Sequence, residues 1–280
     1  MPFKILDPNK APAVITTQKD LRYAIFADGH AGSNFGFLSS NCCDERGNPY
    51  PQNKEQKKSE KNLIAELDKV GKVDVLQYLG DMADGKNSKA GGLDVGNVNT
   101  DVQVEWAINL GKTIIDRLKP SIVMGINGSD YHVDNSLDRQ IIRGLSLIYP
   151  DIEFYYGTQL NVILGDKLWF LNHRFAEGVS KAGSLEKFWN KLHSELYGRG
   201  RTPDVIGYGH IHKAQNPYQI KNGPNPVYGF VSPGLKLPDS FCSKNPSGTH
   251  WEIGFMLIEQ KGVKITGEYI NTYSYWLDKQ

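Results

Sequence analysis

Short apolar runs that end abruptly in polar residues alternate with segments of helical periodicity in the first half of the chain. Such runs are typical of buried β-strands, and they predict strands at 21–27, 73–79 and 121–126. Apolar residues spaced three and four apart predict helices at 59–70, 100–118 and 135–148. Gly71 would end the first helix, and residues 100–103 have the form of a capping box. The repeated unit is a strand, a polar tip and a helix.

Hairpins dominate the second half. Apolar residues at 160–164 and 167–171 flank Gly165 and Asp166, which predicts a two-residue turn. A helix is expected at 184–197, a strand at 204–208, and a last hairpin that pairs 252–259 with 263–270. Strand–helix units followed by hairpins predict an α/β (α+β) protein with two sheets packed together and helices outside.

Composition limits the class of protein. With 280 residues, 39% hydrophobic and 22% charged, the chain has ordinary globular composition, and we expect one domain, 1–280, with 1–20 as an N-terminal extension. The 32 Lys and Arg against 31 Asp and Glu give a net charge of +1, which argues against a generally basic, nucleic-acid-binding surface. Three cysteines, two of them adjacent, favour reduced thiols. No apolar run suits a signal peptide or a membrane span, so we expect a cytoplasmic protein with no membrane partner.

Side chains that bind metals follow five of the predicted strands. They are Asp28 and His30, Asp81 with Asp84, the segment 127–132, His173, and His210 with His212. The carboxyl ends of strands in α/β sheets converge on one crevice. Residues two apart, as in Asp-x-His and His-x-His, can both reach one ion where a strand ends. Mixed His and carboxylate ligands suit Mn, Fe or Zn, so the pattern predicts a transition-metal site.

Three motifs, in their order and separation, resemble those of the calcineurin-like binuclear metallophosphoesterase superfamily. They are Asp28-Gly29-His30, the Gly-Asp-Met-Ala-Asp sequence of 80–84, and Gly209-His210-Ile211-His212, with His173 between the last two. The resemblance spans roughly 21–215 and implies a sandwich of two mixed β-sheets flanked by helices. Residues 128–132 and the sequence around 80–85 are most similar to bacteriophage and prophage members.

The resemblance also implies a cofactor, two divalent metal ions of Mn, Fe or Zn. One ion would be held by Asp28, His30 and His212, and the other by His173 and His210, with Asp81 bridging both. Two such ions activate a bridging hydroxide, which attacks the phosphorus of a phosphate ester.

One part of the family pattern is missing. Most relatives carry Gly-Asn-His followed by Asp or Glu, where the Asn binds the second ion and the His is the acid. This chain has Asn-Gly-Ser-Asp-Tyr-His at 127–132. Asn127 keeps the residue type and Ser129 keeps the position after glycine, so either could be the metal ligand. His132 could be the catalytic acid that protonates the leaving oxygen.

Two further residues could support the site. Asp84 is interpreted as a partner that orients a metal-binding His, because carboxylates commonly do so. Arg174 could meet substrate phosphate or could form a surface salt bridge. The loops 31–53, 85–99 and 236–250, rich in Gly, Ser, Asn and Pro, are expected to form the rim of the pocket.

These residues predict a metal-dependent phosphoesterase. The bacteriophage-like pattern favours phosphodiesters, as in nucleotides or nucleic acid, over phosphomonoesters. Another phosphorus or sulfur ester remains an alternative, since the same hydroxide chemistry would serve it. A noncatalytic scaffold of the same fold is a further alternative, but such relatives tend to lose ligands, and here each ligand type is present.

Overall fold

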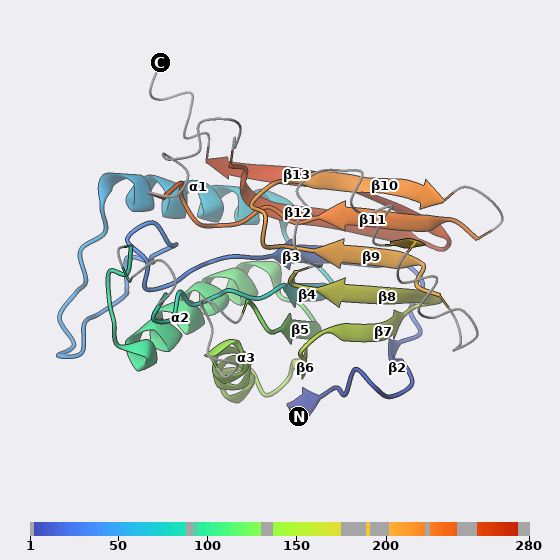
Figure 1. The fold of residues 1–280 in the computed structure, drawn as a ribbon, viewed down its shortest axis with the longest axis horizontal. Helices are drawn as coiled ribbons and strands as arrows, with labels where there is room; N and C mark the ends of the chain where they lie inside the picture. Colours follow the sequence, from blue (N-terminus) through green and yellow to red (C-terminus); the bar gives the residue numbers. More distant parts are fainter. Residues whose placement is uncertain are drawn as a thin grey trace, which may run out of the picture.

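The computed structural model describes residues 3–87, 92, 94–129, 137–174, 189–190, 202–221, 225–239 and 251–273. These residues form a seven-stranded sheet, a six-stranded sheet and three long helices (Figure 1). The predicted sandwich of two mixed β-sheets flanked by helices is confirmed. None of the helices in the described ranges combines the length and the hydropathy needed to cross a membrane.

The seven-stranded sheet carries most of the parallel strands. Its order is β1 (Lys4–Ile5), β6 (Glu153–Gly157), β5 (Ile122–Ile126), β4 (Val75–Tyr78), β3 (Leu21–Phe26), β12 (Ile253–Lys261) and β13 (Lys264–Tyr273). The neighbours from β1 to β3 are all parallel, whereas β12 is antiparallel to β3 and to β13. The carboxyl ends of β3, β4 and β5 therefore lie side by side at one edge.

The six-stranded sheet contains the predicted hairpin. Its order is β10 (Gln215–Lys221), β11 (Val227–Val231), β9 (Val205–Tyr208), β8 (Lys167–Asn172), β7 (Leu160–Leu164) and β2 (Ala13–Thr16), and Figure 1 shows most of these strands stacked in that order. Leu164 pairs with Lys167 across the two-residue turn. Strands β8, β9 and β11 are parallel, so β8 and β9 also end at a common edge.

Two apolar cores hold these layers together. The helices α1 (Lys54–Val70), α2 (Thr100–Leu118) and α3 (Leu137–Ile148) bury Leu63, Leu110 and Ile141 against the outer face of the seven-stranded sheet. The second core lies between the sheets, where Tyr23 and Trp169 pack with their ring centroids 4.6 Å apart. Alternate residues of each central strand thus serve the two cores.

The helix starts differ from the predictions. Helix α1 begins at Lys54, because Asn53 and Gln56 form a capping box there. The capping box predicted at 100–103 is wrong, since Asn99 caps α2 by accepting a hydrogen bond from the backbone of Asp101. Gln103 is buried instead, where its amide bonds the backbone of Gly85 and the carbonyl of residue 97. A buried side chain with three such bonds is not available for capping.

Several segments were not predicted as strands. The residues interpreted as an N-terminal extension contain β1 and β2, which form an edge of each sheet. Their polar, proline-bearing sequence suits edges, where few positions are buried. Strand β6 was also missed. The helix predicted at 184–197 falls almost entirely outside the described residues.

Candidate metal centre

The turns that carry the predicted ligands have an unusual backbone. Asp28, His30, Asp81, His210 and His212 have φ angles of 53°, 46°, 51°, 70° and 49°. Only two other non-glycine residues in the described part of the chain, Asn87 and Lys119, have positive φ. Left-handed conformations cost an ordinary residue free energy, and such strain is typical of functional sites. The tight turns direct several side chains from different strands toward one point.

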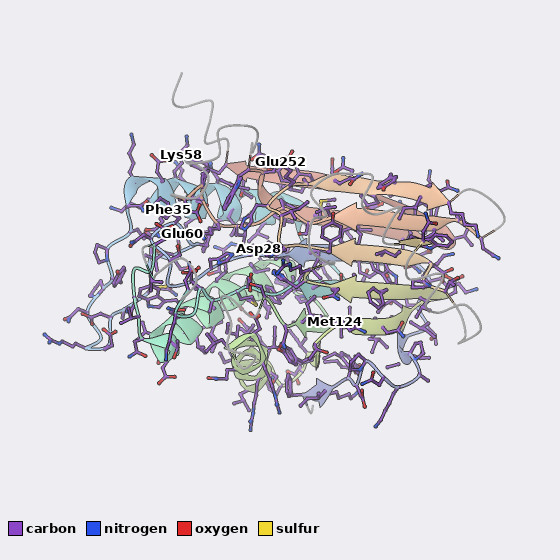
Figure 2. The ribbon with its side chains drawn as sticks, viewed as in Figure 1. Asp28, Phe35, Lys58, Glu60, Met124 and Glu252 are labelled. Carbon is purple, nitrogen blue, oxygen red and sulfur yellow. The ribbon has the colours of Figure 1, made fainter. Side chains whose placement is uncertain are left out.

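Hydrogen bonds between the turns fix their relative positions. The backbone N–H of Asp28 donates to the carbonyl of Gly80 at 3.0 Å, and that of His30 donates to the carbonyl of Asp81 at 2.9 Å. The N–H of His210 donates to Asp28 Oδ2 at 2.9 Å. The strand ends of both sheets are therefore joined at the site, and Figure 2 places Asp28 where the strands meet the helices.

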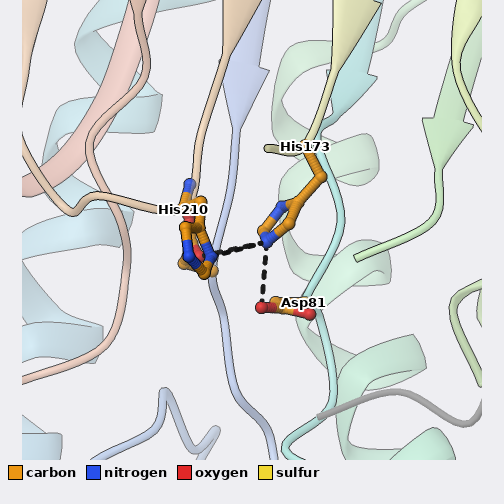
Figure 3. A group of neighbouring side chains, drawn as sticks. Asp81, His173 and His210 are labelled. Atoms are coloured by element: carbon orange, nitrogen blue, oxygen red, sulfur yellow. Dashed lines mark hydrogen bonds and ion pairs between the residues drawn. The ribbon is translucent and has the colours of Figure 1, made fainter. Parts of the chain in front are cut away.

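Two groups of metal-binding atoms form at this junction. In each group, ligand atoms lie within 4.8 Å of one another: Asp28, Asp81, His173 and His210 in one, and Asp28, His30 and His212 in the other. Within the first group, His173 Nε2 lies 3.0 Å from Asp81 Oδ2 and 3.2 Å from His210 Nδ1 (Figure 3). The six core residues singled out in the sequence thus meet in space, as two candidate metal-binding groups consistent with a binuclear site.

The division of ligands differs from the one that the resemblance implies. Asp28, rather than Asp81, is the residue common to both groups. Its Oδ1 lies 3.7 Å from His30 Nε2, 3.6 Å from His212 Nε2 and 4.0 Å from His173 Nε2. The bridging role of Asp81 stays a prediction.

The surroundings of these side chains fit bound cations. Asp28 Oδ1 and His212 Nδ1 are buried and have no hydrogen-bond partner among the described residues, which is costly unless a cation or water completes the site. His173 Nδ1 faces the carbonyl of Leu79 at 2.5 Å, and this contact directs Nε2 into the centre. Metal-binding His side chains are commonly held in this way through their second nitrogen. The Asp and His donors suit Mn, Fe or Zn.

Burial and neighbouring charges shift the pKa of His173 upward and the pKa values of His210 and His212 downward. Burial disfavours a charge on His173, but the carboxylates of Asp81 and Asp28 outweigh it and raise its pKa to about 10. Burial and the neighbouring charge of His173 lower the pKa of His210 to about 4. Burial lowers the pKa of His212 to about 3, and the charges of His30 and Lys236 add to this effect. At neutral pH the metal-free site therefore holds a protonated His173 beside two neutral imidazoles that can accept a cation.

Of the two residues at the departure from the family pattern, Ser129 contacts the predicted ligand Asp81. Its backbone N–H donates to Asp81 Oδ1 at 2.8 Å, and its hydroxyl donates to Asp81 Oδ2 at 3.0 Å. The amide oxygen of Asn127 instead accepts a hydrogen bond from the Tyr156 hydroxyl. Whether Ser129 binds a metal stays a prediction, whereas the position of Asn127 relates it to a neighbouring pocket. His132 lies outside the described residues.

The two supporting residues lie near ligands. Asp84 is buried, and its Oδ1 lies 2.9 Å from His30 Nδ1, the contact that its interpretation as an orienting partner requires. Arg174 is half-buried, and its charge contributes to the lowered pKa of His210. Both alternatives for Arg174, a phosphate contact and a salt bridge, stay open.

Sequence reasoning missed three residues at the site. Asp138, buried at the start of α3, accepts hydrogen bonds from the backbone N–H groups of Asp81, Met82 and Gly128. Trp251 stacks on the His212 ring, with centroids 4.0 Å apart. Lys236 is buried beside Asp84. Of these three residues, only Lys236 could have been noticed in the sequence, because it stands between two leucines in a short apolar segment bounded by prolines.

A pocket of about 460 Å³ lies beside Asn127, the residue that follows β5. Apolar side chains form much of its wall, and Arg139 is a basic residue at its rim. Its lining includes Ile5, Leu6, Asp7, Asn127, Arg139 and Tyr156. The pocket is large enough for a group the size of a nucleoside.

The structure contains both the two-sheet sandwich and the cluster of Asp and His residues that the resemblance implies. The fold is a sandwich of two mixed β-sheets flanked by helices, the architecture that the resemblance implies. No protein-family model matches the chain, and no curated protein matches it. The bacteriophage or prophage subtype stays a prediction.

Several solved structures are similar to the chain, including a phosphatase and a protein of unknown function. One is the purple acid phosphatase PPD1 from seeds of yellow lupin (Lupinus luteus), with 14% identity, a TM-score of 0.39, and coverage of 90% of this chain and 52% of that chain. The other is a protein of unknown function, AQ665 from Aquifex aeolicus, with 16% identity, a TM-score of 0.34, and coverage of 69% and 80%. The chain spans about half the length of the lupin phosphatase.

Proposed function

We propose that this protein is a metal-dependent phosphoesterase that hydrolyses phosphodiesters, in nucleotides or nucleic acid, in preference to monoesters. The observation that carries the proposal is the pair of Asp and His groups that share Asp28 at the joined strand ends of the two sheets. Buried carboxylates and imidazoles in this number are expensive to maintain without a cation.

Each residue of the candidate metal centre would have a distinct role in binding metal or substrate. Asp28, His30 and His212 would hold one cation, and Asp28 with Asp81, His173 and His210 would hold the other. Divalent cations held there supply a nucleophilic water of lowered pKa and neutralise the charge that a phosphate ester develops as it reacts. Ser129 keeps the Asp81 carboxylate in place through its backbone N–H and its hydroxyl. His132 is proposed as the acid that protonates the leaving oxygen, and Arg174 as a contact for the substrate phosphate.

The pocket lined by Asn127, two residues before Ser129, supports the choice of diesters. A monoester has one organic group, whereas a diester has two that need space on either side of the phosphorus. A flat, partly apolar group such as a nucleoside suits apolar walls with Asp7 and Asn127 as polar partners. The guanidinium of Arg139 would then pair with a neighbouring phosphate of the substrate.

Hydrolysis of two chromogenic esters tests the proposal. Bis(p-nitrophenyl) phosphate and p-nitrophenyl phosphate are compared with added Mn²⁺ and with a strong chelator. We expect turnover of the diester to exceed that of the monoester and to stop with chelator. Asp81→Asn and His210→Ala should lose activity at least 100-fold and stay folded, whereas Asp151→Asn, which changes an exposed carboxylate between α3 and β6, should keep it. Hydrolysis that the chelator leaves untouched would contradict the proposal.

A further inference from the structure

A buried lysine stands behind the metal centre. The side chain of Lys236 is 4% exposed, and its Nζ lies 2.9 Å from Asp239 Oδ2 and 4.0 Å from Asp84 Oδ1. Taking an ammonium group out of water costs several kcal/mol unless nearby charges compensate it. An apolar side chain would fill this position at a lower cost in desolvation free energy. A charged side chain here therefore indicates a role at the carboxylates that it contacts.

The segment that carries Lys236 forms one wall of the site. Residues 232–238, which follow β11, are all buried. The backbone N–H of Lys236 donates to the carbonyl of Asp28 at 3.0 Å. A Cβ atom on Gly234 would come within 2.3 Å of His212 Nδ1, so the backbone there lies directly against that imidazole. Leu235 and Leu237 anchor the segment in apolar clusters on either side of the lysine. The ammonium group is therefore held at a fixed distance from the ligands.

Asp84 connects the lysine to a predicted ligand. Its side chain is fully buried, and its Oδ1 is the atom that faces both His30 Nδ1 at 2.9 Å and Lys236 Nζ at 4.0 Å. The other ring nitrogen of His30, Nε2, lies 3.7 Å from Asp28 Oδ1. A line of contacts thus runs from the buried ammonium through one carboxylate to the imidazole, and ends in the group of Asp28, His30 and His212.

We propose that Lys236 is a positioning residue of the metal centre, which holds the Asp84 carboxylate so that Asp84 keeps His30 oriented toward Asp28. The inference rests on the metal centre of the proposed function. It concerns one of the two groups, because the described side-chain contacts of Lys236 reach His30 through Asp84 and do not reach His173 or His210. Loss of its charge weakens the cation held by Asp28, His30 and His212 and leaves the other cation in place.

Metal titration of variants tests this role. Mn²⁺ and Zn²⁺ binding is measured in competition with a chromogenic chelator, with folding followed by circular dichroism. Changes to partners of metal ligands typically cost 10–100-fold in metal affinity. We expect Lys236→Met to weaken one of two sites by roughly that factor. Lys236→Arg, which keeps the charge, should recover much of the affinity. Lys167→Met serves as the matched control, since Lys167 is also buried but lies at the far end of β8 from His173.

A double variant distinguishes a positioning role of Lys236 from a general loss of stability at the site. If Lys236 acts through Asp84, Lys236→Met should cause no further loss of affinity in an Asp84→Asn background. This background also removes the fully buried one of the two carboxylates that the lysine compensates, so the double variant stays informative if Lys236→Met alone does not fold. Two wild-type sites in folded Lys236→Met, or an additive loss in the double variant, would overturn the inference. A wild-type protein that binds no metal would instead refute the proposed function.

Discussion

The left-handed backbone at the candidate ligands predicts an inverted preference between glycine and alanine. At His212, where φ is 49°, both His212→Gly and His212→Ala remove the imidazole and its contact with Trp251. They differ only in the Cβ atom. A left-handed conformation costs a residue with a Cβ roughly 1–2 kcal/mol, while glycine adopts it freely. The greater freedom of glycine in the unfolded chain offsets about 0.4–1 kcal/mol of this advantage.

The metal-free His212→Gly protein should therefore be about 1 kcal/mol more stable than His212→Ala. The control pair is Lys61→Gly and Lys61→Ala, because Lys61 is exposed within helix α1. There alanine should be the more stable by about 1 kcal/mol. The two pairs thus differ in sign, and their contrast is about 2 kcal/mol.

Urea unfolding in the presence of a chelator measures all four variants. A difference of 1 kcal/mol corresponds to roughly 2–4 °C in Tm for a domain of this size, so thermal unfolding provides a second readout. If alanine is more stable than glycine at both positions, the backbone at His212 is not strained, and the claim that the fold stores strain at its ligands is wrong.

Three further predictions concern the centre and its pocket. Because the pKa of His173 is raised to about 10, its proton is bound at pH 8 in the metal-free protein and should be released when metal binds. Calorimetry in buffers of different ionisation enthalpy should therefore detect the release of about one proton per chain. Release of no proton would contradict the assignment of His173 as a metal ligand. Gly128→Ala places a Cβ 1.9 Å from Asp81 Oδ1, so we expect the Asp81 carboxylate to be displaced. Activity should fall on the order of 100-fold, while circular dichroism shows that the fold is retained. Unchanged kinetics would refute the close contact between the turns that carry Gly128 and Asp81. Arg139→Ala should raise the KM for a dinucleotide about tenfold but leave that for bis(p-nitrophenyl) phosphate unchanged, and equal effects on both esters would exclude the pocket as a nucleotide site.

Much of the fold could be predicted because its central strands are short and strongly apolar. The strands at β3, β4 and β5, and the hairpins β7–β8 and β12–β13, follow from local pattern and turn residues alone. The edge strands β1 and β2 could not, since a two- or four-residue strand with exposed positions has no periodic signal. Their pairing depends on partners more than 140 residues away.

The candidate site was predictable in composition but not in detail. Asp28, His30, Asp81, His173, His210 and His212 could be selected because each follows a strand, and strand ends converge. Which carboxylate is shared depends on side-chain directions within turns, which spacing does not encode. The roles of Lys236 and Asp138 depend on contacts between segments far apart in the chain, so their partners become visible only in the fold.

The most direct test of the binuclear centre is the metal content of purified protein, measured by mass spectrometry after loading with Mn²⁺ or Zn²⁺ and dialysis. The wild-type chain should hold about two ions, His212→Ala and His210→Ala should each hold about one, and Asp28→Ala, which removes the residue common to both groups, should hold neither firmly. A wild-type chain without bound metal, or an Asp28→Ala variant that keeps both ions, would contradict the binuclear assignment.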